Sequence, residues 1–346
     1  MQKLPYCSII ILNRNGKHHL NDCFSSLRKL NYPKKRYEAI MVDNASSDGS
    51  IEYVKKNFKE VKIVANKVGL GFAAGNNEGV KRARGEYIIL LNNDTKVQKN
   101  WLIELVKVAQ SDKTIGLCTS KLLLFSKRDT VNYAGGFIHY LGFSWPIGLF
   151  EKDGKKFDEL KETTQASGGS LLIKRNLIKR IGMLDGDFFL YVEDTDYSWR
   201  ARLNGFKIFY VPKSMVYHKY GATISRENKG EKIYFLERNR IVMLLKDYSL
   251  KTLLVLVPML ILFELALIVF LPMPKLRGYV SIFRNFERIL KKRIEVQKLR
   301  KISDKQITDA FVSDFKDFEY FDKSYIIEKI LNPILRIYWK IAKKLI

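Results

Sequence analysis

Polar side chains follow several short apolar runs in the N-terminal part of the chain. The apolar runs are Ser8–Leu12, Glu38–Val42, Val61–Ala65 and Glu86–Leu91, and the residues directly after them are Asn13, Asp43, Asn66 and Asn92-Asn93-Asp94. Amide and carboxylate groups can hydrogen-bond a nucleoside or bind a divalent cation. If the apolar runs are neighbouring strands, these side chains form one polar binding cleft.

The segment Gly85–Thr95, GEYIILLNNDT, carries a carboxylate at the end of its apolar run. Asp94 supplies the charge, and hard oxygen ligands suit Mg²⁺ or Mn²⁺ held against a substrate diphosphate. Taken alone, an Asn-Asn-Asp sequence after a strand is equally typical of a turn.

The segment Val42–Ser50, VDNASSDGS, places Asp43 at a strand terminus, directly before a helix. A carboxylate at that point is well placed to hydrogen-bond a base or a ribose. The alternative for this segment is helix capping, which Asp48 or Ser50 would provide.

The segment Phe188–Arg200, FFLYVEDTDYSWR, gathers Glu193, Asp194 and Asp196 at the start of a helix. Acidic residues there cap the helix and complement its dipole. Adjacent carboxylates also raise one another's proton affinity, which produces a base that works near neutral pH. The segment by itself is compatible with both interpretations.

A glycine-rich segment, Asn66–Gly79, has the sequence NKVGLGFAAGNNEG. Its glycines follow a GxGxxxG spacing and do not lie in the first strand-to-helix turn, where a dinucleotide fingerprint would lie. They therefore give little support to a dinucleotide-binding function.

Amphipathic segments separate the apolar runs, at His18–Lys29, Ser50–Phe58 and Phe72–Ala83. This alternation predicts an α/β fold with a mostly parallel central sheet flanked by helices. The carboxyl ends of parallel strands lie along one edge, where open α/β folds bind their ligands. The polar residues named above are therefore expected to meet there.

The pattern is less regular after about residue 115. We expect a strand at Ser170–Ile173, a short helix from Arg175, a strand at Phe188–Val192, and a helix at Thr195–Asn204 that Gly205 terminates.

The composition is that of a folded, strongly basic protein of 346 residues, 47% of them hydrophobic, with a formal net charge of +25. Such an excess favours polyanionic partners, namely nucleic acid, anionic lipid or phosphate-bearing substrates. No zinc-finger pattern or arginine-rich block supports nucleic-acid binding.

The cysteines and the N-terminal sequence bear on the compartment of the protein. Cys7, Cys23 and Cys118 form no CxxC pattern, which is typical of a reducing compartment. The apolar run at Ser8–Leu12 is too short for a signal peptide core. We therefore expect the protein to remain on the cytoplasmic side.

The segment Thr252–Met273 is apolar and just long enough to cross a bilayer. Glu264 in its middle and Pro258 in its first half argue against a simple crossing. A basic stretch follows, from Lys275 to Lys301, and a crossing would carry it to the far side against the positive-inside tendency. We favour a re-entrant or interfacial helix, and the alternative is a buried helix of a soluble domain.

The C-terminal segment also has the pattern of an interfacial helix. Its apolar residues recur at helical spacing and are Ile326, Ile327, Ile330, Leu331, Ile334, Leu335, Tyr338 and Trp339. Lys329, Arg336, Lys340, Lys343 and Lys344 lie largely off that stripe. Such a helix suits the headgroup region of an anionic membrane, although a helix packed on the protein with a solvated basic face has the same pattern.

The four polar and glycine-containing segments, in this order and with the adjacent pair Glu193-Asp194, resemble glycosyltransferase family 2, especially its rhamnosyltransferase-like branch. The resemblance covers Ser8 to Ser225. It implies a GT-A fold with a catalytic domain at residues 1–235. A membrane-associating segment would follow at 236–273, with a basic amphipathic helical region at 274–346.

The resemblance also implies roles for individual residues. The nucleotide-sugar-binding residues would be Asn13, Asp43, Asn44, Asn77, Asn92, Asn93 and Asp94. Asp94 would match the last residue of the family's DxD-type motif, although Asn92 stands where the first aspartate would be. The general base would be Asp194, supported by Glu193, and the donor and acceptor loop residues would be Gly168, Gly169, Trp199 and Arg200. Asp94 and His218 would bind the divalent metal, Mg²⁺ or Mn²⁺.

The implied function is that of an inverting glycosyltransferase at the cytoplasmic face of the cell membrane, attached peripherally or monotopically. The donor would be a nucleotide-diphosphate sugar, either dTDP-rhamnose or a UDP-sugar. The acceptor would be a hydroxyl of a lipid-linked saccharide in cell-surface polysaccharide or glycan synthesis. The alternatives are a nucleotidyltransferase and a non-catalytic membrane-bound protein with a degenerate transferase fold.

Overall fold

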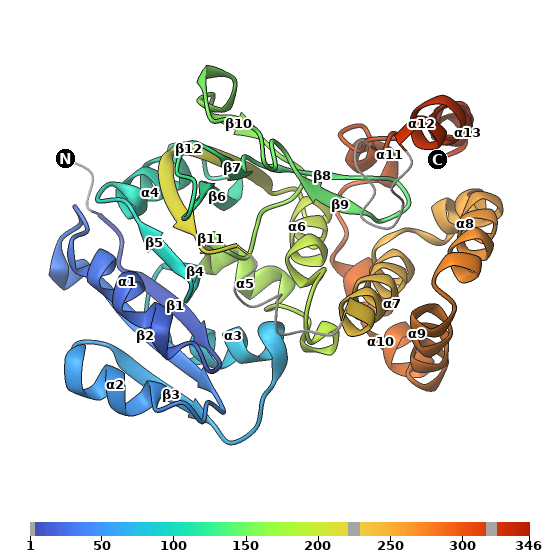
Figure 1. Cartoon of the computed structure of the whole chain (residues 1–346). Helices are drawn as coiled ribbons and strands as arrows, with labels where there is room; N and C mark the ends of the chain where they lie inside the picture. The colour runs from blue at the N-terminus through green and yellow to red at the C-terminus, as the bar shows by residue number, and fades with distance from the viewer. Residues whose placement is uncertain (1–3, 221–228, 316–323) are drawn as a thin grey trace. The chain divides into compact units, whose positions relative to one another are not determined.

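The computed structural model of the chain describes residues 4–220, 229–315 and 324–346 (Figure 1). The end of the family resemblance, 221–225, and part of the predicted basic region, 316–323, lie outside the described residues. The chain forms two compact units. Unit 1 contains Met1–Gly136 and Pro146–Glu227, and unit 2 contains Phe137–Trp145 and Asn228–Ile346.

Unit 1 is built around a large mixed sheet. Its main strands are β1 (Cys7–Asn13), β2 (Tyr37–Asn44), β3 (Lys62–Asn66), β4 (Tyr87–Asn92), β5 (Thr95–Val97), β6 (Ile115–Leu124), β7 (Val131–Tyr133), β10 (Lys161–Glu162), β11 (Ser170–Lys174) and β12 (Lys207–His218). Its helices are α1 (Lys17–Arg28), α2 (Ser50–Asn57), α3 (Gly71–Arg82), α4 (Trp101–Ser111), α5 (Arg175–Ile181) and α6 (Glu193–Leu203), with short 3₁₀ turns at Lys34–Arg36, Lys155–Phe157 and Gly186–Phe188. A separate two-stranded ribbon joins β8 (Gly136–Ile138) to β9 (Ser144–Pro146).

The strand order places the predicted polar residues at one edge. The sheet runs β10-β12-β6-β11-β4-β1-β2-β3, and β1 pairs in parallel with both β2 and β4. In the register of these pairs Asn13 lies opposite Asp43, and Leu12 lies opposite Asn92. The predicted α/β fold is therefore confirmed. The sheet is mixed because β11 enters antiparallel between β4 and β6.

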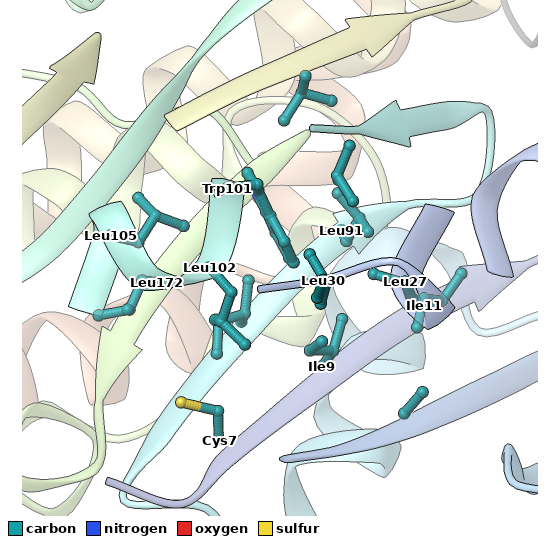
Figure 2. Close-up of a cluster of buried hydrophobic side chains, with 14 of the residues drawn as sticks. Cys7, Ile9, Ile11, Leu27, Leu30, Leu91, Trp101, Leu102, Leu105 and Leu172 are labelled. Carbon is teal, nitrogen blue, oxygen red and sulfur yellow. The ribbon is translucent and has the colours of Figure 1, made fainter. Parts of the chain in front are cut away.

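Alternate residues of β1 pack into two different hydrophobic layers. Ile9 and Ile11 face a core that also contains residues of α1 and α4, among them Leu27 and Trp101 (Figure 2). Ile10 faces the opposite core, which contains residues of α3, α5 and α6. Burial of both faces holds the strands rigidly and fixes where their carboxyl ends lie.

The glycines of α3 allow it to pack closely on the sheet. A methyl group at Gly75 would lie 2.6 Å from the Leu12 side chain, and one at Gly79 would lie 2.5 Å from Ile10. Gly75, the last glycine of the GxGxxxG spacing, thus serves helix-to-sheet packing, as does Gly79 after it.

The predicted strand at Phe188–Val192 is wrong. The chain there leaves a 3₁₀ turn, and Phe189, Tyr191 and Val192 all have positive φ, between 63° and 70°. Such backbone cannot continue in an extended strand. The predicted helix after it does form, beginning at Glu193 and followed by Gly205 in the left-handed region.

The described part of unit 2 outside the inserted segment Phe137–Trp145 consists mainly of helices and the turns that join them. Its helices are α7 (Lys229–Asp247), α8 (Leu250–Phe270), α9 (Pro272–Arg284), α10 (Phe286–Leu299), α11 (Asp304–Thr308), α12 (Ser324–Ile326) and α13 (Asn332–Leu345), with a π-helical turn at Ile327–Leu331. In the described part of the chain, α8 is the one helix long and apolar enough to cross a membrane.

Candidate active site

A cleft of about 600 Å³ opens at the predicted edge of the sheet in unit 1. Nine of the predicted site residues line it, namely Asn44, Asn92, Asn93, Asp94, Gly168, Gly169, Glu193, Asp194 and His218. Five others lie outside the lining, namely Asn13, Asp43, Asn77, Trp199 and Arg200. Asp94, just after β4, and the carboxyls of Glu193 and Asp194 in α6 therefore share one cleft.

Asn13 and Asp43 form a buried network beneath the cleft. Asn13 donates from Nδ2 to Oδ1 of Asp43 at 3.2 Å, and Asp43 Oδ2 accepts from the backbone nitrogen of Ser46 at 2.9 Å. Asn13 Oδ1 in turn accepts from Nδ2 of Asn93 at 2.7 Å. The network connects the ends of β1 and β2 to the residues after β4 and fixes the position of Asn93.

Asn44 stabilises the loop that precedes α3. Its Oδ1 accepts from the backbone nitrogen of Leu70 at 2.9 Å and from Asn66 Nδ2 at 3.2 Å, while its Nδ2 donates to Gly71 O at 3.2 Å. These bonds bring the glycine-rich segment to the cleft.

Asp94 and His218 form a close pair from distant parts of the sequence. Antiparallel pairing of β12 with β5 sets His218 opposite Thr95, so Nε2 of His218 lies 3.2 Å from Oδ1 of Asp94. Oδ1 is buried and accepts no hydrogen bond within the described residues. Burial alone would raise the pKa of Asp94, but when His218 is protonated, its charge and its Nε2 proton hold that pKa below the ordinary value.

Asn132 orients the imidazole of His218. Its Oδ1 lies 2.8 Å from Nδ1, which therefore donates and leaves Nε2 with a lone pair in the neutral ring. The Nε2 lone pair and Oδ1 of Asp94, 3.2 Å apart, repel one another unless a proton or a cation lies between them. Nitrogen and oxygen ligands of this kind suit a divalent cation. Within the described residues no group of three His, Cys, Asp or Glu side chains could hold a metal, so such a cation would need further ligands from the substrate.

Asp194 faces the cleft from the first turn of α6. Its Oδ2 accepts from the backbone nitrogen of Gly168 at 3.0 Å. The candidate general base therefore contacts the predicted donor and acceptor loop. Burial raises the pKa of the Asp194 carboxyl above its ordinary value, although the hydrogen bonds from Gly168 and Thr195 partly oppose the shift. A carboxylate with a raised pKa is a stronger base.

Glu193 is buried beside Asp194. Burial first, and then the neighbouring charge of Asp194, raise the pKa of Glu193 well above its ordinary value. Its Oε2 has no hydrogen-bond partner within the described residues. The adjacent carboxyls are therefore not equivalent, because the charged form of Glu193 is the more strongly disfavoured.

A strained loop leads into α6. Phe189, Tyr191 and Val192 hold left-handed backbone that costs about 1–2 kcal/mol for each such residue. Strain of this kind persists where surrounding contacts impose it, and it concentrates at functional sites. Here the backbone nitrogen of Phe72 donates to Phe189 O, and Gly71 packs against the same carbonyl.

Three predicted residues are held by structural contacts away from the cleft lining. Asn77 donates to Leu184 O at 2.8 Å, Trp199 is fully buried, and Arg200 pairs with Asp196 through Nε and Oδ2 at 2.7 Å. Any influence of these residues on substrates would pass through the packing of α3 and α6.

Several cleft residues were not predicted. Arg14, His18 and Tyr220 line the cleft, as does Tyr191 in the strained loop. Arg14 follows Asn13 directly, so the end of the first strand could have indicated it. Asn132, which orients His218, lies in the irregular part of the chain and gave no signal.

Comparison with known proteins places the chain in a family. The sequence profile of glycosyl transferase family 2 matches residues 8–182, just over half of the chain, and the chain therefore belongs to that family. A relative is the poly-beta-1,6-N-acetyl-D-glucosamine synthase of Staphylococcus epidermidis, 26% identical over 226 residues. That match covers 64% of this chain and 52% of the synthase, so the chain spans about half the length of this relative.

Solved structures confirm the predicted GT-A fold. GalNAc-T7, crystallised with UDP, GalNAc and Mn²⁺, has a TM-score of 0.61 at 20% identity over 75% of this chain and 51% of its own. TarS of S. aureus, residues 1–349 in complex with UDP, has a TM-score of 0.51 at 15% identity over 98% and 88% of the two chains.

Proposed function

We propose that the protein is an inverting glycosyltransferase that moves a sugar from a nucleotide-diphosphate sugar to an acceptor hydroxyl. The observation that carries the proposal is the placement of Asp194, a carboxylate with a raised pKa, in the same cleft as the Asp94–His218 pair. Membership of glycosyl transferase family 2 supports it at the level of the reaction class.

The proposed reaction is a single displacement. Asp194 accepts the proton of the acceptor hydroxyl as that oxygen bonds to the anomeric carbon of the donor. The bond between the anomeric carbon and the diphosphate oxygen breaks on the opposite face, so the configuration inverts. Gly168 holds the carboxylate in place through Oδ2, and the raised pKa of Glu193 disfavours a second negative charge beside it.

Asp94 and His218 are the proposed metal ligands. Oδ1 of Asp94 and Nε2 of His218 suit Mg²⁺ or Mn²⁺, and GalNAc-T7 was crystallised with Mn²⁺. When bound, the cation would neutralise charge on the departing diphosphate. Asn92 replaces an acidic residue here, so His218 supplies the second protein ligand.

The proposed donor is a UDP-sugar, with dTDP-rhamnose as the second candidate. UDP was present in the crystals of GalNAc-T7 and TarS, which favours uridine. We retain dTDP-rhamnose as a candidate donor because the sequence motifs resemble the rhamnosyltransferase-like branch of the family. The nucleoside would lie near Asn44 and Asn93, above the buried pair of Asn13 and Asp43.

The proposed acceptor is a lipid-linked saccharide at the cytoplasmic face of the membrane. The S. epidermidis relative is a polysaccharide synthase, which favours a growing glycan as acceptor. The net charge of +25 and the apolar helix α8 favour an anionic membrane surface. We assign catalysis to residues 1–235 and membrane association to 236–346.

A donor screen tests the proposed reaction. The purified full chain is incubated with UDP- and dTDP-sugars and Mn²⁺, and release of the nucleoside diphosphate is measured. We expect slow release with one donor and loss of release with EDTA. Release of pyrophosphate from a nucleoside triphosphate and a sugar phosphate would identify a nucleotidyltransferase instead. No turnover of any donor would favour a non-catalytic protein.

A further inference from the structure

Unit 2 exposes an unusual amount of apolar surface. In the described part of the chain, all but four of the exposed large hydrophobic side chains lie between Leu250 and Leu345. The four are Val68, Phe150, Leu160 and Tyr220. Single exposed hydrophobic residues are normal, but a large contiguous set marks a surface that binds a partner.

Helix α8 is apolar on the face that it leaves exposed. It buries one stripe, which consists of Thr252, Leu256, Met259, Phe263 and Leu267. The opposite face exposes Leu250, Leu254, Val257, Ile261, Leu262, Leu265, Val269 and Phe270, and Val269 is 75% exposed. A helix on the water-facing surface of a soluble domain carries polar residues on that face.

Glu264, the acidic residue of α8, is neutralised within unit 2. It forms ion pairs with Arg240 of α7 and Lys275 of α9. Both cations also pair with Glu237 of α7, at 2.8 Å and 2.9 Å. Because Arg240, Lys275 and Glu237 are buried, these contacts hold α8 against α7 and α9.

Helices α9 and α10 also expose apolar side chains. Their exposed hydrophobic residues recur at helical spacing and are Met273, Leu276, Val280 and Phe283 in α9, and Phe286, Leu290 and Ile294 in α10. Phe283 is 84% exposed. Basic residues accompany them, among which Lys291 is exposed.

Helix α13 has three distinct faces. Leu335, Trp339 and Ala342 are buried, so part of the apolar stripe in the sequence packs on the protein. Ile334, Ile337, Ile341 and Leu345 form a second, exposed apolar stripe, and Arg336, Lys340 and Lys344 form an exposed basic stripe. Tyr338 donates its hydroxyl to Val255 O at 2.5 Å, which places α13 beside α8.

We propose that the exposed apolar faces of α8, α9, α10 and α13 bind the surface of an anionic lipid bilayer. Helix α8 then lies in one leaflet, and both of its ends remain on the same side of the membrane. This inference rests on the membrane attachment in the proposed function and specifies the residues and the geometry that produce it.

The charges beside the apolar stripes favour lipid over a second protein chain. Lysine is depleted in protein–protein interfaces. It is enriched beside the apolar face of helices that lie in the membrane interface, where it meets anionic headgroups. The basic stripe of α13, including Lys340 and Lys344, adjoins Ile337 and Ile341 in this way.

Vesicle sedimentation of the full chain tests the surface. We expect binding to phosphatidylcholine vesicles that contain phosphatidylglycerol, with weaker binding at high salt. The double variant Ile337→Glu/Ile341→Glu should bind at least about tenfold more weakly because it places charge in the apolar stripe. Leu160→Glu, at an exposed apolar position of unit 1, is the matched control and should bind normally. Absence of vesicle binding would overturn the proposal. A dimer that buries this face and does not bind vesicles would also overturn it.

Labelling of introduced cysteines tests the geometry. The native cysteines are buried, so Lys251→Cys in the first turn of α8 and Lys291→Cys in α10, beyond its other end, provide single reactive sites. A membrane-impermeant maleimide added outside the vesicles should label both. Protection of one site until detergent is added would show a crossing and contradict the proposal. Donor hydrolysis is measured without vesicles. Absence of hydrolysis would therefore contradict only the proposed reaction, and absence of vesicle binding would contradict only the proposed membrane surface.

Discussion

At the residue scale, Glu193 and Asp194 show how two adjacent carboxyls acquire different chemistry. Asp194 has a backbone donor in Gly168, whereas Oε2 of Glu193 is buried without a hydrogen-bond partner in the described chain. Both pKa values are raised by burial, that of Glu193 the more strongly. The difference favours Asp194 over Glu193 as the carboxyl that ionises in the cleft.

The raised pKa of Glu193 predicts a pH-dependent loss of stability. As the pH rises above the ordinary glutamate pKa, the unfolded chain loses its proton first, so the folded chain becomes relatively less stable. Glu193→Gln removes this effect and should raise the Tm at pH 8 but not at pH 4.5. Each pKa unit corresponds to about 1.4 kcal/mol, and each kcal/mol to about 2–4 °C in a domain of this size.

Thermal unfolding followed by circular dichroism at the two pH values measures the effect. Glu159→Gln, on an exposed glutamate, is the matched control and should leave the Tm unchanged at both. Equal Tm differences at pH 4.5 and pH 8 would show that Glu193 is ionised in the folded chain.

The sequence indicated the polar residues at the strand ends, but not the side chains that contact them in the folded chain. Asn13, Asp43 and Asp94 end up close to the cleft because each directly follows a strand whose neighbours could be inferred. The pairing of Asp94 with His218 depends on the antiparallel contact of β12 with β5, which no local pattern encodes. The resemblance to a family proposed His218, and Asn132 was missed.

At the element scale, the segment before α6 was predicted as a strand because Phe188–Val192 is aromatic and apolar. The structure instead uses these side chains in a tight, left-handed turn that meets the start of α3. Gly71 makes that meeting possible because a methyl group there would lie 2.3 Å from Phe189 O. Tertiary contact overrides strand propensity in this segment.

Gly71→Ala should therefore displace the loop that leads into α6 and positions Asp194. Gly49→Ala is a matched control, since Gly49 has nearly the same φ, 75° against 74°, but a methyl group there would meet no atom closer than 3.4 Å. The control should lose about 1–2 kcal/mol of unfolding free energy through backbone strain alone. Gly71→Ala should lose more and should also lower kcat/KM for the donor. Equal effects of the two variants in denaturation and in turnover would show that the contact with Phe189 is unimportant.

At the scale of the whole molecule, composition indicated an anionic partner, and the apolar segments indicated the membrane. Sequence reasoning missed that Phe137–Trp145 belongs to unit 2, because a short insertion gains its contacts only after folding. His139, in that insertion, stacks on Phe315 with ring centroids 4.4 Å apart. Sequence also could not separate the buried and exposed apolar faces of α13, since both repeat with the helical period.

The catalytic claim depends most directly on Asp194, and kinetics of Asp194→Asn test it. Asparagine keeps the size of aspartate and can still accept the hydrogen bond from Gly168, but it cannot take a proton from the acceptor. We expect kcat to fall by about 10²–10⁴ while the Kd for the nucleotide sugar changes by less than about threefold. A variant that keeps more than about a tenth of the wild-type kcat would show that Asp194 is not the base.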